Sequence, residues 1–123
     1  MSSKAKSSPM ESATKWLESH GFKNIRAAEV ENYEEPSNIV RQRDEETFTP
    51  MATARKNGSK YYFEIAEKPS KDERERLIQK WTLLAELAEI RDGKFQVFAP
   101  YGTFSFTKRV IANHNIDAEI VKI

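Results

Sequence analysis

The sequence contains no cysteine, which excludes a disulfide framework and any zinc or iron–sulfur site built from thiolates. It has only two histidines, His20 and His114, and their separation argues against a histidine-rich metal site. No apolar run approaches the roughly 20 residues that a membrane-spanning helix needs, and the first residues form no apolar signal region. We therefore expect a soluble, cytoplasmic protein with no membrane partner.

An excess of charge of one sign is also missing, since 20 Lys and Arg stand against 19 Asp and Glu. The formal net charge of +1 does not draw nucleic acid to the whole molecule, so such binding requires a local basic patch. Seven Phe, four Tyr and two Trp in 123 residues supply enough large groups for a core. We predict a disordered tail over residues 1–9 and a single domain over residues 10–123.

The strongest local signal is a β-hairpin in the middle of the chain. Asn57-Gly58 lies between two extended runs, residues 48–55 and 60–67, and both turn residues tolerate a positive φ. Residues 31–46, just before it, are rich in charge and turn formers. They read as a solvated loop or a twisted hairpin arm, with a short strand at Ile39 and Val40 as one option.

A long helix is predicted over residues 71–91. Ser70 and Glu73 have the spacing of a capping box, and Gly93 follows the last turn. The apolar residues recur at helical spacing and form a broad face typical of a helix packed on a sheet: Leu77, Trp81, Leu84 and Ala88, widened by Leu83, Leu87 and Ile90.

Shorter elements complete the order. We expect helices over residues 10–20 and 103–113, and strands over residues 24–31, 94–99 and 117–123. A helix between the hairpin and the next strand requires a crossover, so the sheet should be mixed, with helices on its faces. The predicted fold class is a three-layer α/β domain with the element order αβββαβαβ.

This order, together with the residues around the hairpin, resembles the restriction-endonuclease-like fold of the PD-(D/E)XK nuclease superfamily. Pro50 stands where that family has its proline, and the turn at Asn57-Gly58 falls within the family's hairpin. Residues 61–65 look like its third strand, with Glu64 as the acid of that strand. The resemblance covers most of the chain from residue 10 onward.

The resemblance implies a site at which two carboxylates hold a divalent metal and a lysine positions the attacking water. This sequence departs from it twice, because Met51 occupies the aspartate position and Ala66 the lysine position. On a continuing strand Lys68 would share a face with Glu64 and could replace the lysine. Gln79 is similar to a polar residue that several families of this fold place near the site. The alternative for Glu64 and Gln79 is an ordinary surface or strand role.

The hairpin tip carries Arg55, Lys56 and Lys60, which are candidates for contacts with DNA or RNA phosphates. Charged hairpin tips also protect sheet edges from aggregation, and that is the alternative interpretation.

Three functions follow from this pattern. The leading one is a decayed, non-catalytic nuclease that binds nucleic acid or another protein and needs no cofactor. The second is a Mg²⁺-dependent nuclease with a rearranged site that uses Glu64 and Lys68. The third is a homodimeric scaffold without a nucleic-acid role.

Overall fold

The computed structural model describes residues 8–123 and contains three helices and seven strands in that range. The elements in chain order are α1 (Pro9–Ser19), β1 (Lys23–Ala27), β2 (Ile39–Arg41), β3 (Glu46–Phe48), β4 (Ala52–Lys56), β5 (Ser59–Ile65), α2 (Lys71–Ile90), β6 (Phe95–Ala99), α3 (Phe104–Asn113) and β7 (Glu119–Lys122). No helix among these residues is long and apolar enough to cross a bilayer.

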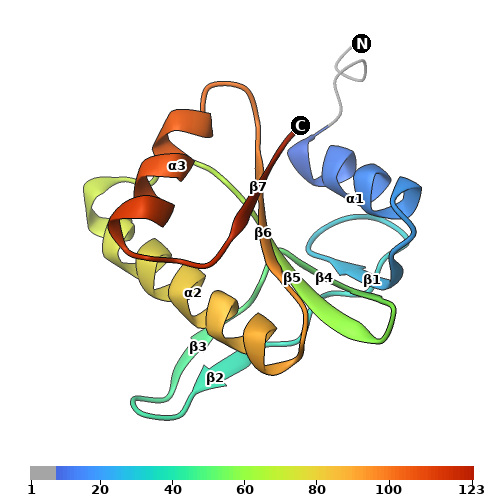
Figure 1. The fold of residues 1–123 in the computed structure, drawn as a ribbon, viewed down its shortest axis with the longest axis horizontal. Coiled ribbons are helices and arrows are strands. Elements are labelled where there is room, and N and C mark those ends of the chain that lie inside the picture. The colour runs from blue at the N-terminus through green and yellow to red at the C-terminus, as the bar shows by residue number, and fades with distance from the viewer. Residues whose placement is uncertain (1–7) are drawn as a thin grey trace.

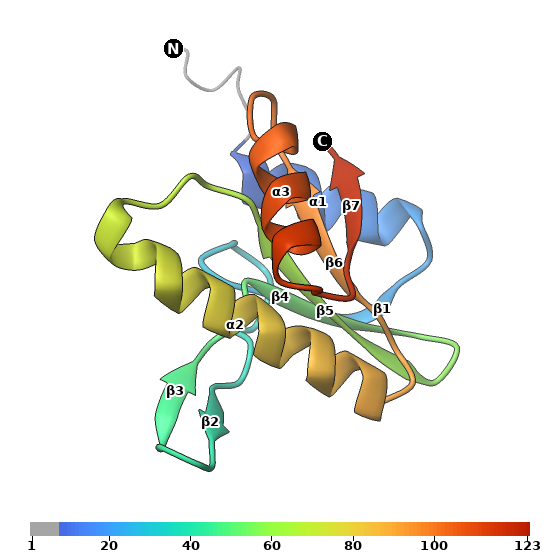
Figure 2. The ribbon, with the colours of Figure 1, turned by 60° about the vertical axis from the view of Figure 1, so that its left-hand side comes forward.

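The main sheet has five strands in the order β1-β4-β5-β6-β7 (Figures 1 and 2). Strands β1, β4 and β5 pair antiparallel, whereas β6 and β7 join the sheet parallel to β5. The pairing changes from antiparallel to parallel at β5, where α2 carries the chain across to β6, as a parallel connection requires. The predicted mixed sheet is confirmed.

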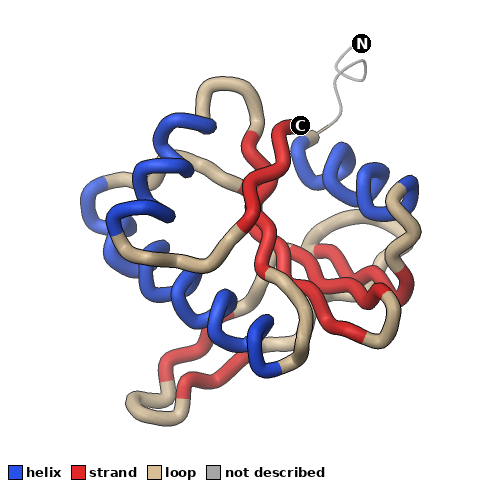
Figure 3. The backbone as a smooth tube through the Cα atoms, viewed as in Figure 1, coloured by secondary structure: helices blue, strands red, loops and turns tan. Residues whose placement is uncertain are grey.

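Helices cover both faces of this sheet, with α1 on one side and α2 and α3 on the other (Figure 3). The alternation along β5 supplies both cores, because Phe63 packs toward α1 and Tyr62 toward α2. Leu17 of α1 and Trp81 of α2 are fully buried in the two cores. The architecture is therefore a three-layer α/β arrangement.

Helix α1 begins earlier than the sequence pattern predicts. Ser8 caps it, with its hydroxyl oxygen accepting from the Glu11 N–H at 3.1 Å, and Pro9 is its first residue. Residues 1–7 of the predicted tail lie outside the described residues, but Pro9 belongs to the helix. Gly21, with φ +81°, follows the predicted end of the helix.

The predicted strand over residues 48–55 is wrong at its start. Phe48 belongs to β3, which pairs with β2 in a separate two-stranded sheet, so residues 31–46 include one arm of a hairpin. The chain bends at the buried Pro50, which has no N–H to donate to a ladder, and β4 starts at Ala52. The Asn57-Gly58 hairpin between β4 and β5 is confirmed.

Two other predicted strands are too long. The strand over residues 24–31 ends at Ala27, because Glu29 adopts a φ of +59° and its N–H turns to the Glu35 carboxylate at 2.8 Å. The strand over residues 60–67 ends at Ile65, shortly before the break at Pro69. Strands β6 and β7 and helix α3 confirm the remaining predictions within a few residues.

Helix α2 confirms the predicted long helix, and Trp81, Leu84 and Ala88 of the predicted stripe are buried. Ile90, predicted to widen this face, is the last residue of the helix and is 73% exposed, so the prediction is wrong there. The Glu73 carboxylate accepts from the Ser70 N–H at 3.3 Å, which satisfies one exposed donor at its start. Gly93 follows its end, but Asp92 takes the left-handed φ of +59°. Gly93 is needed for a close approach instead, since a Cβ there would lie 1.7 Å from the Lys60 carbonyl oxygen.

Candidate functional site

Glu64 lies near the carboxyl end of β5, on the face covered by α2, and is only 5% exposed. Its carboxylate receives three donors from the protein. The Met51 N–H lies 2.9 Å from Oε2, the Lys80 Nζ lies 3.1 Å from the same oxygen, and the Trp81 Nε1 lies 3.3 Å from Oε1. The carboxylate thereby ties β5 to the chain just before β4 and to α2.

Two opposing effects set the charge state of this acid. Burial disfavours the carboxylate and raises the pKa of Glu64 above its ordinary value. The positive charge of Lys80, together with the hydrogen bonds from Lys80, Met51 and Trp81, works in the opposite direction. A buried carboxylate with these donors has a structural role, and both of its oxygens already accept hydrogen bonds from the protein.

Lys68 lies beside the same site but does not take the predicted position. Because β5 ends at Ile65, Lys68 belongs to the connection to α2 and its side chain is exposed. It lines an open hollow of about 340 Å³ together with Glu64, Glu67 and Lys80. The lysine that contacts Glu64 is Lys80 from α2, and no ion pair links Glu64 to Lys68 among the described residues.

The donor set does not fit the Mg²⁺ ion that the resemblance implies. Met51 offers its backbone N–H where the family has a carboxylate, and an N–H cannot bind a cation. Across residues 8–123, no three Asp, Glu, His or Cys side chains gather as a metal site requires. To bind a metal, Glu64 would have to give up its protein donors, and β4 carries no acid that could complete the site.

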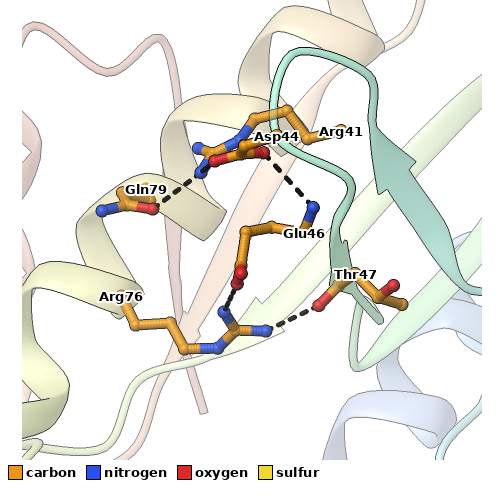
Figure 4. Close-up of polar contacts among 6 residues, drawn as sticks. All are labelled: Arg41, Asp44, Glu46, Thr47, Arg76 and Gln79. Carbon is orange, nitrogen blue, oxygen red and sulfur yellow. Dashed lines mark hydrogen bonds and ion pairs between the residues drawn. The ribbon is translucent and has the colours of Figure 1, made fainter.

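Gln79 lies next to Lys80 on α2, but its side chain contacts the β2–β3 hairpin and not Glu64. Its side-chain oxygen accepts from Arg41 of β2 at 3.0 Å (Figure 4). Arg41 also binds Asp44 at 2.6 Å, and Arg76 of α2 donates to the Glu46 carboxylate at 2.8 Å. These contacts attach the β2–β3 hairpin to α2, so Gln79 has a structural role in this arrangement.

A buried aromatic ring completes the attachment of this hairpin. Phe48 is buried beneath the guanidinium groups of Arg41 and Arg76, which lie 5.2 and 4.3 Å from its ring centre. Arg76 also donates to the Thr47 carbonyl at 2.6 Å. The hairpin is therefore held by polar and apolar contacts together.

The three predicted phosphate-binding residues do not act as one group. Arg55 and Lys60 are direct partners across β4 and β5 and lie on the α2 face of the sheet. Lys56, one residue further along β4, lies on the opposite face with its Nζ 4.9 Å from the centre of the Phe22 ring. The three residues are close in sequence, but successive side chains of a strand point to opposite faces, and this separates Lys56 from Arg55 and Lys60.

Sequence reasoning missed Lys80, Arg26 and Arg91. Lys80 had a signal, because it follows Leu77 by three residues and so falls on the buried stripe of α2. Arg26 and Arg91 lie near Lys60 only through the pairing of β1 with β4 and the packing at Gly93. Nothing local in the sequence indicates that proximity.

Comparisons of this chain with protein-family models, with curated proteins and with solved structures found no match.

Proposed function

We propose that this chain is a non-catalytic protein of restriction-endonuclease-like architecture that associates with nucleic acid. The observation that carries the proposal is the environment of Glu64, the acid at the position of a metal ligand in the nucleases that the sequence resembles. Its carboxylate is engaged by Met51, Lys80 and Trp81, and β4 supplies no second acid. A structural use accounts for an acid at this position without a metal.

The arrangement of the main sheet supports the architectural part. Three antiparallel strands, β1, β4 and β5, are followed by the crossover helix α2 and by the parallel strand β6. Helix α1 covers the other face, which gives the helix, three strands, helix and strand of the proposed architecture (Figure 1). The β2–β3 hairpin is an addition between the first two strands of this core.

Cations without an acidic partner support the nucleic-acid part. Arg55 and Lys60 line an open polar hollow, and within residues 8–123 neither forms an ion pair. Phosphate contacts from such residues supply most of the affinity in non-specific binding of nucleic acid. The net charge of the protein is only +1, so binding of nucleic acid depends on this local group of positive charges.

The test is binding and cleavage of labelled DNA and RNA by the purified protein, with Mg²⁺, with Mn²⁺ and with EDTA. We expect salt-dependent binding that EDTA leaves unchanged, and intact nucleic acid in every lane. The absence of binding at low salt would contradict the proposal. A dimer in sedimentation together with no nucleic-acid binding would favour the scaffold instead. A cytoplasmic location belongs to the same proposal and is tested by cell fractionation.

A nuclease with a rearranged site is the second candidate, because two lysines lie around Glu64. Lys80 contacts its carboxylate, and Lys68 lines the same hollow. Metal-dependent cleavage that is lost in both Glu64→Ala and Lys68→Ala would establish this candidate. Lys71→Ala removes an exposed charge from the first turn of α2 and is the matched control for Lys68→Ala.

A further inference from the structure

Cations from three neighbouring strands, β1, β4 and β5, meet on the α2 face of the sheet, near the β4–β5 turn. Arg55 lies directly opposite Lys60, and Arg26 of β1 pairs with Thr53, two residues before Arg55 on the same face. These residues line an open polar hollow of about 480 Å³. The lining also includes the neutral polar side chains of Asn24, Asn32 and Ser37, and one acid, Glu34.

Helix α2 adds a fourth cation, Arg91, at its C-terminal end. The absence of a side chain at Gly93 lets the turn after α2 rest on the Lys60 carbonyl, which brings the end of α2 to the β4–β5 hairpin (Figure 2). Burial lowers the pKa of the Lys60 amine, and the positive charges of Arg91, Arg55 and Arg26 lower it further. All four cations therefore act on one region.

These charges are poorly compensated by the protein itself. Within residues 8–123 no acid pairs with Arg55, Lys60 or Arg91, and Arg26 has only the exposed Glu34, at 3.3 Å. Like charges directly opposite each other in an antiparallel pair destabilise a sheet. The cross-strand pair of Arg55 with Lys60 thus costs stability that a bound anion would return.

We infer that this hollow is the binding site for phosphates of the nucleic-acid backbone. The inference rests on the proposed function and locates its contacts at the amino end of β5, away from Glu64 at the carboxyl end. The cations come from three strands and a helix end, and Arg26, Arg55 and Lys60 line the open hollow, so they suit a run of phosphates. The neutral side chains of the lining offer the hydrogen bonds that position a backbone without reading its sequence.

The experiment measures binding of a short fluorescent DNA duplex, and of its single strand, by anisotropy between about 50 and 200 mM salt. Lys60→Gln and Arg55→Gln should each weaken duplex binding roughly fivefold at ~0.1 M salt and reduce the salt slope by about 0.9. Lys56→Gln is the matched control, because it removes the same charge one residue away from Arg55 but on the other face of the sheet. It should leave both quantities close to those of the wild type.

Melting curves guard against a trivial loss of binding through unfolding. Lys60→Gln removes a like-charge pair with Arg55, so it should melt at or above the temperature of the wild type. Equal losses in Lys60→Gln and Lys56→Gln would overturn the inference in favour of the whole hairpin tip. Wild-type binding that neither Lys60→Gln nor Arg55→Gln weakens would overturn the inference alone. If the wild type binds neither oligonucleotide, the proposed function is overturned as well. This holds even if the protein binds a phosphopeptide.

Discussion

The two ends of β5 use charge in opposite ways. At the carboxyl end, the buried Glu64 faces Lys80 and two N–H donors, so its charge and lone pairs are compensated inside the protein. At the amino end, Lys60 faces Arg55 and other cations with no acid paired to it among the described residues. The first arrangement holds elements together, whereas the second opposes folding and is open to an anion. The acid at one end of β5 is therefore engaged by protein donors, whereas the cations at the other end have no acid paired to them among the described residues, apart from Arg26 with Glu34.

The largest effect is expected from the core beneath Glu64. Trp81 is fully buried, and its Nε1 donates to the Glu64 carboxylate. Trp81→Ala should lower the free energy of unfolding by about 3–5 kcal/mol, the usual range for deleting a large buried aromatic side chain. Urea denaturation followed by circular dichroism measures this loss. Trp81→Phe keeps most of the ring but loses the donor, so it should be clearly milder, and equal losses in both variants would contradict this account.

The next effect concerns the ion pair. Lys80→Met leaves the Glu64 carboxylate buried without its cation and should cost about 1–3 kcal/mol. This figure is below the range for a wholly buried pair because the Lys80 side chain is 22% exposed. Lys68→Met is the control, since Lys68 lines the same hollow without pairing to Glu64. A larger loss in the control would show that Lys68 is the working partner.

The pH dependence of stability tests the same pair independently. Burial raises the pKa of Glu64, so the folded protein binds this proton more tightly than the unfolded chain does. Between the unfolded pKa of about 4.3 and the raised folded value, the free energy of unfolding should therefore fall as the pH rises. Glu64→Gln should remove this slope, and Lys80→Met should steepen it, in urea titrations at several pH values. A slope unchanged in Glu64→Gln would contradict the assignment.

A metal titration distinguishes a structural role of Glu64 from a role as a metal ligand. Calorimetry with Mg²⁺ and Mn²⁺ should detect weak binding or none in the wild type, because Met51 presents an N–H to Glu64. Met51→Asp with Ala66→Lys restores the pattern of the nucleases and should create weak metal binding. Micromolar binding by the wild type that Glu64→Gln abolishes would overturn the structural interpretation of Glu64.

Local signals predicted the parts of the fold that local interactions determine. The Asn57-Gly58 turn and the apolar stripe of α2 appear in the structure where the sequence places them. The sequence does not single out the β2–β3 hairpin, because its attachment depends on distant contacts such as the one between Arg76 and Glu46, 30 residues apart. A period of two or 3.6 residues cannot reveal such a contact.

The candidate site was predictable only in part, for the same reason. Glu64 is identifiable because a strand acid follows a clear hairpin, but its partner Lys80 comes from a helix, and no local pattern pairs the two residues. Lys68 shares a face with Glu64 only if the strand continues beyond Ile65, and β5 ends at that residue. The pairing of Lys60 with Arg55 follows from the turn, while the arrival of Arg91 depends on the close approach at Gly93.

The smallest effect is expected where charges are paired but exposed, in the turn of the β2–β3 hairpin. Arg41 holds the pKa of the Asp44 carboxyl at about 2 through a hydrogen bond. The carboxylate form is therefore favoured in the folded state, and its contribution to stability is present above the unfolded pKa of about 3.9 and lost as the pH falls toward 2. Asp44→Asn should lower the melting temperature at neutral pH by less than Lys80→Met does, and the difference from the wild type should vanish near pH 2.

Glu45→Gln changes the neighbouring exposed acid, which shows no ion pair among residues 8–123, and should have no comparable effect. A loss in Asp44→Asn that persists at pH 2 would show that the turn, and not the charge pair with Arg41, carries the stability.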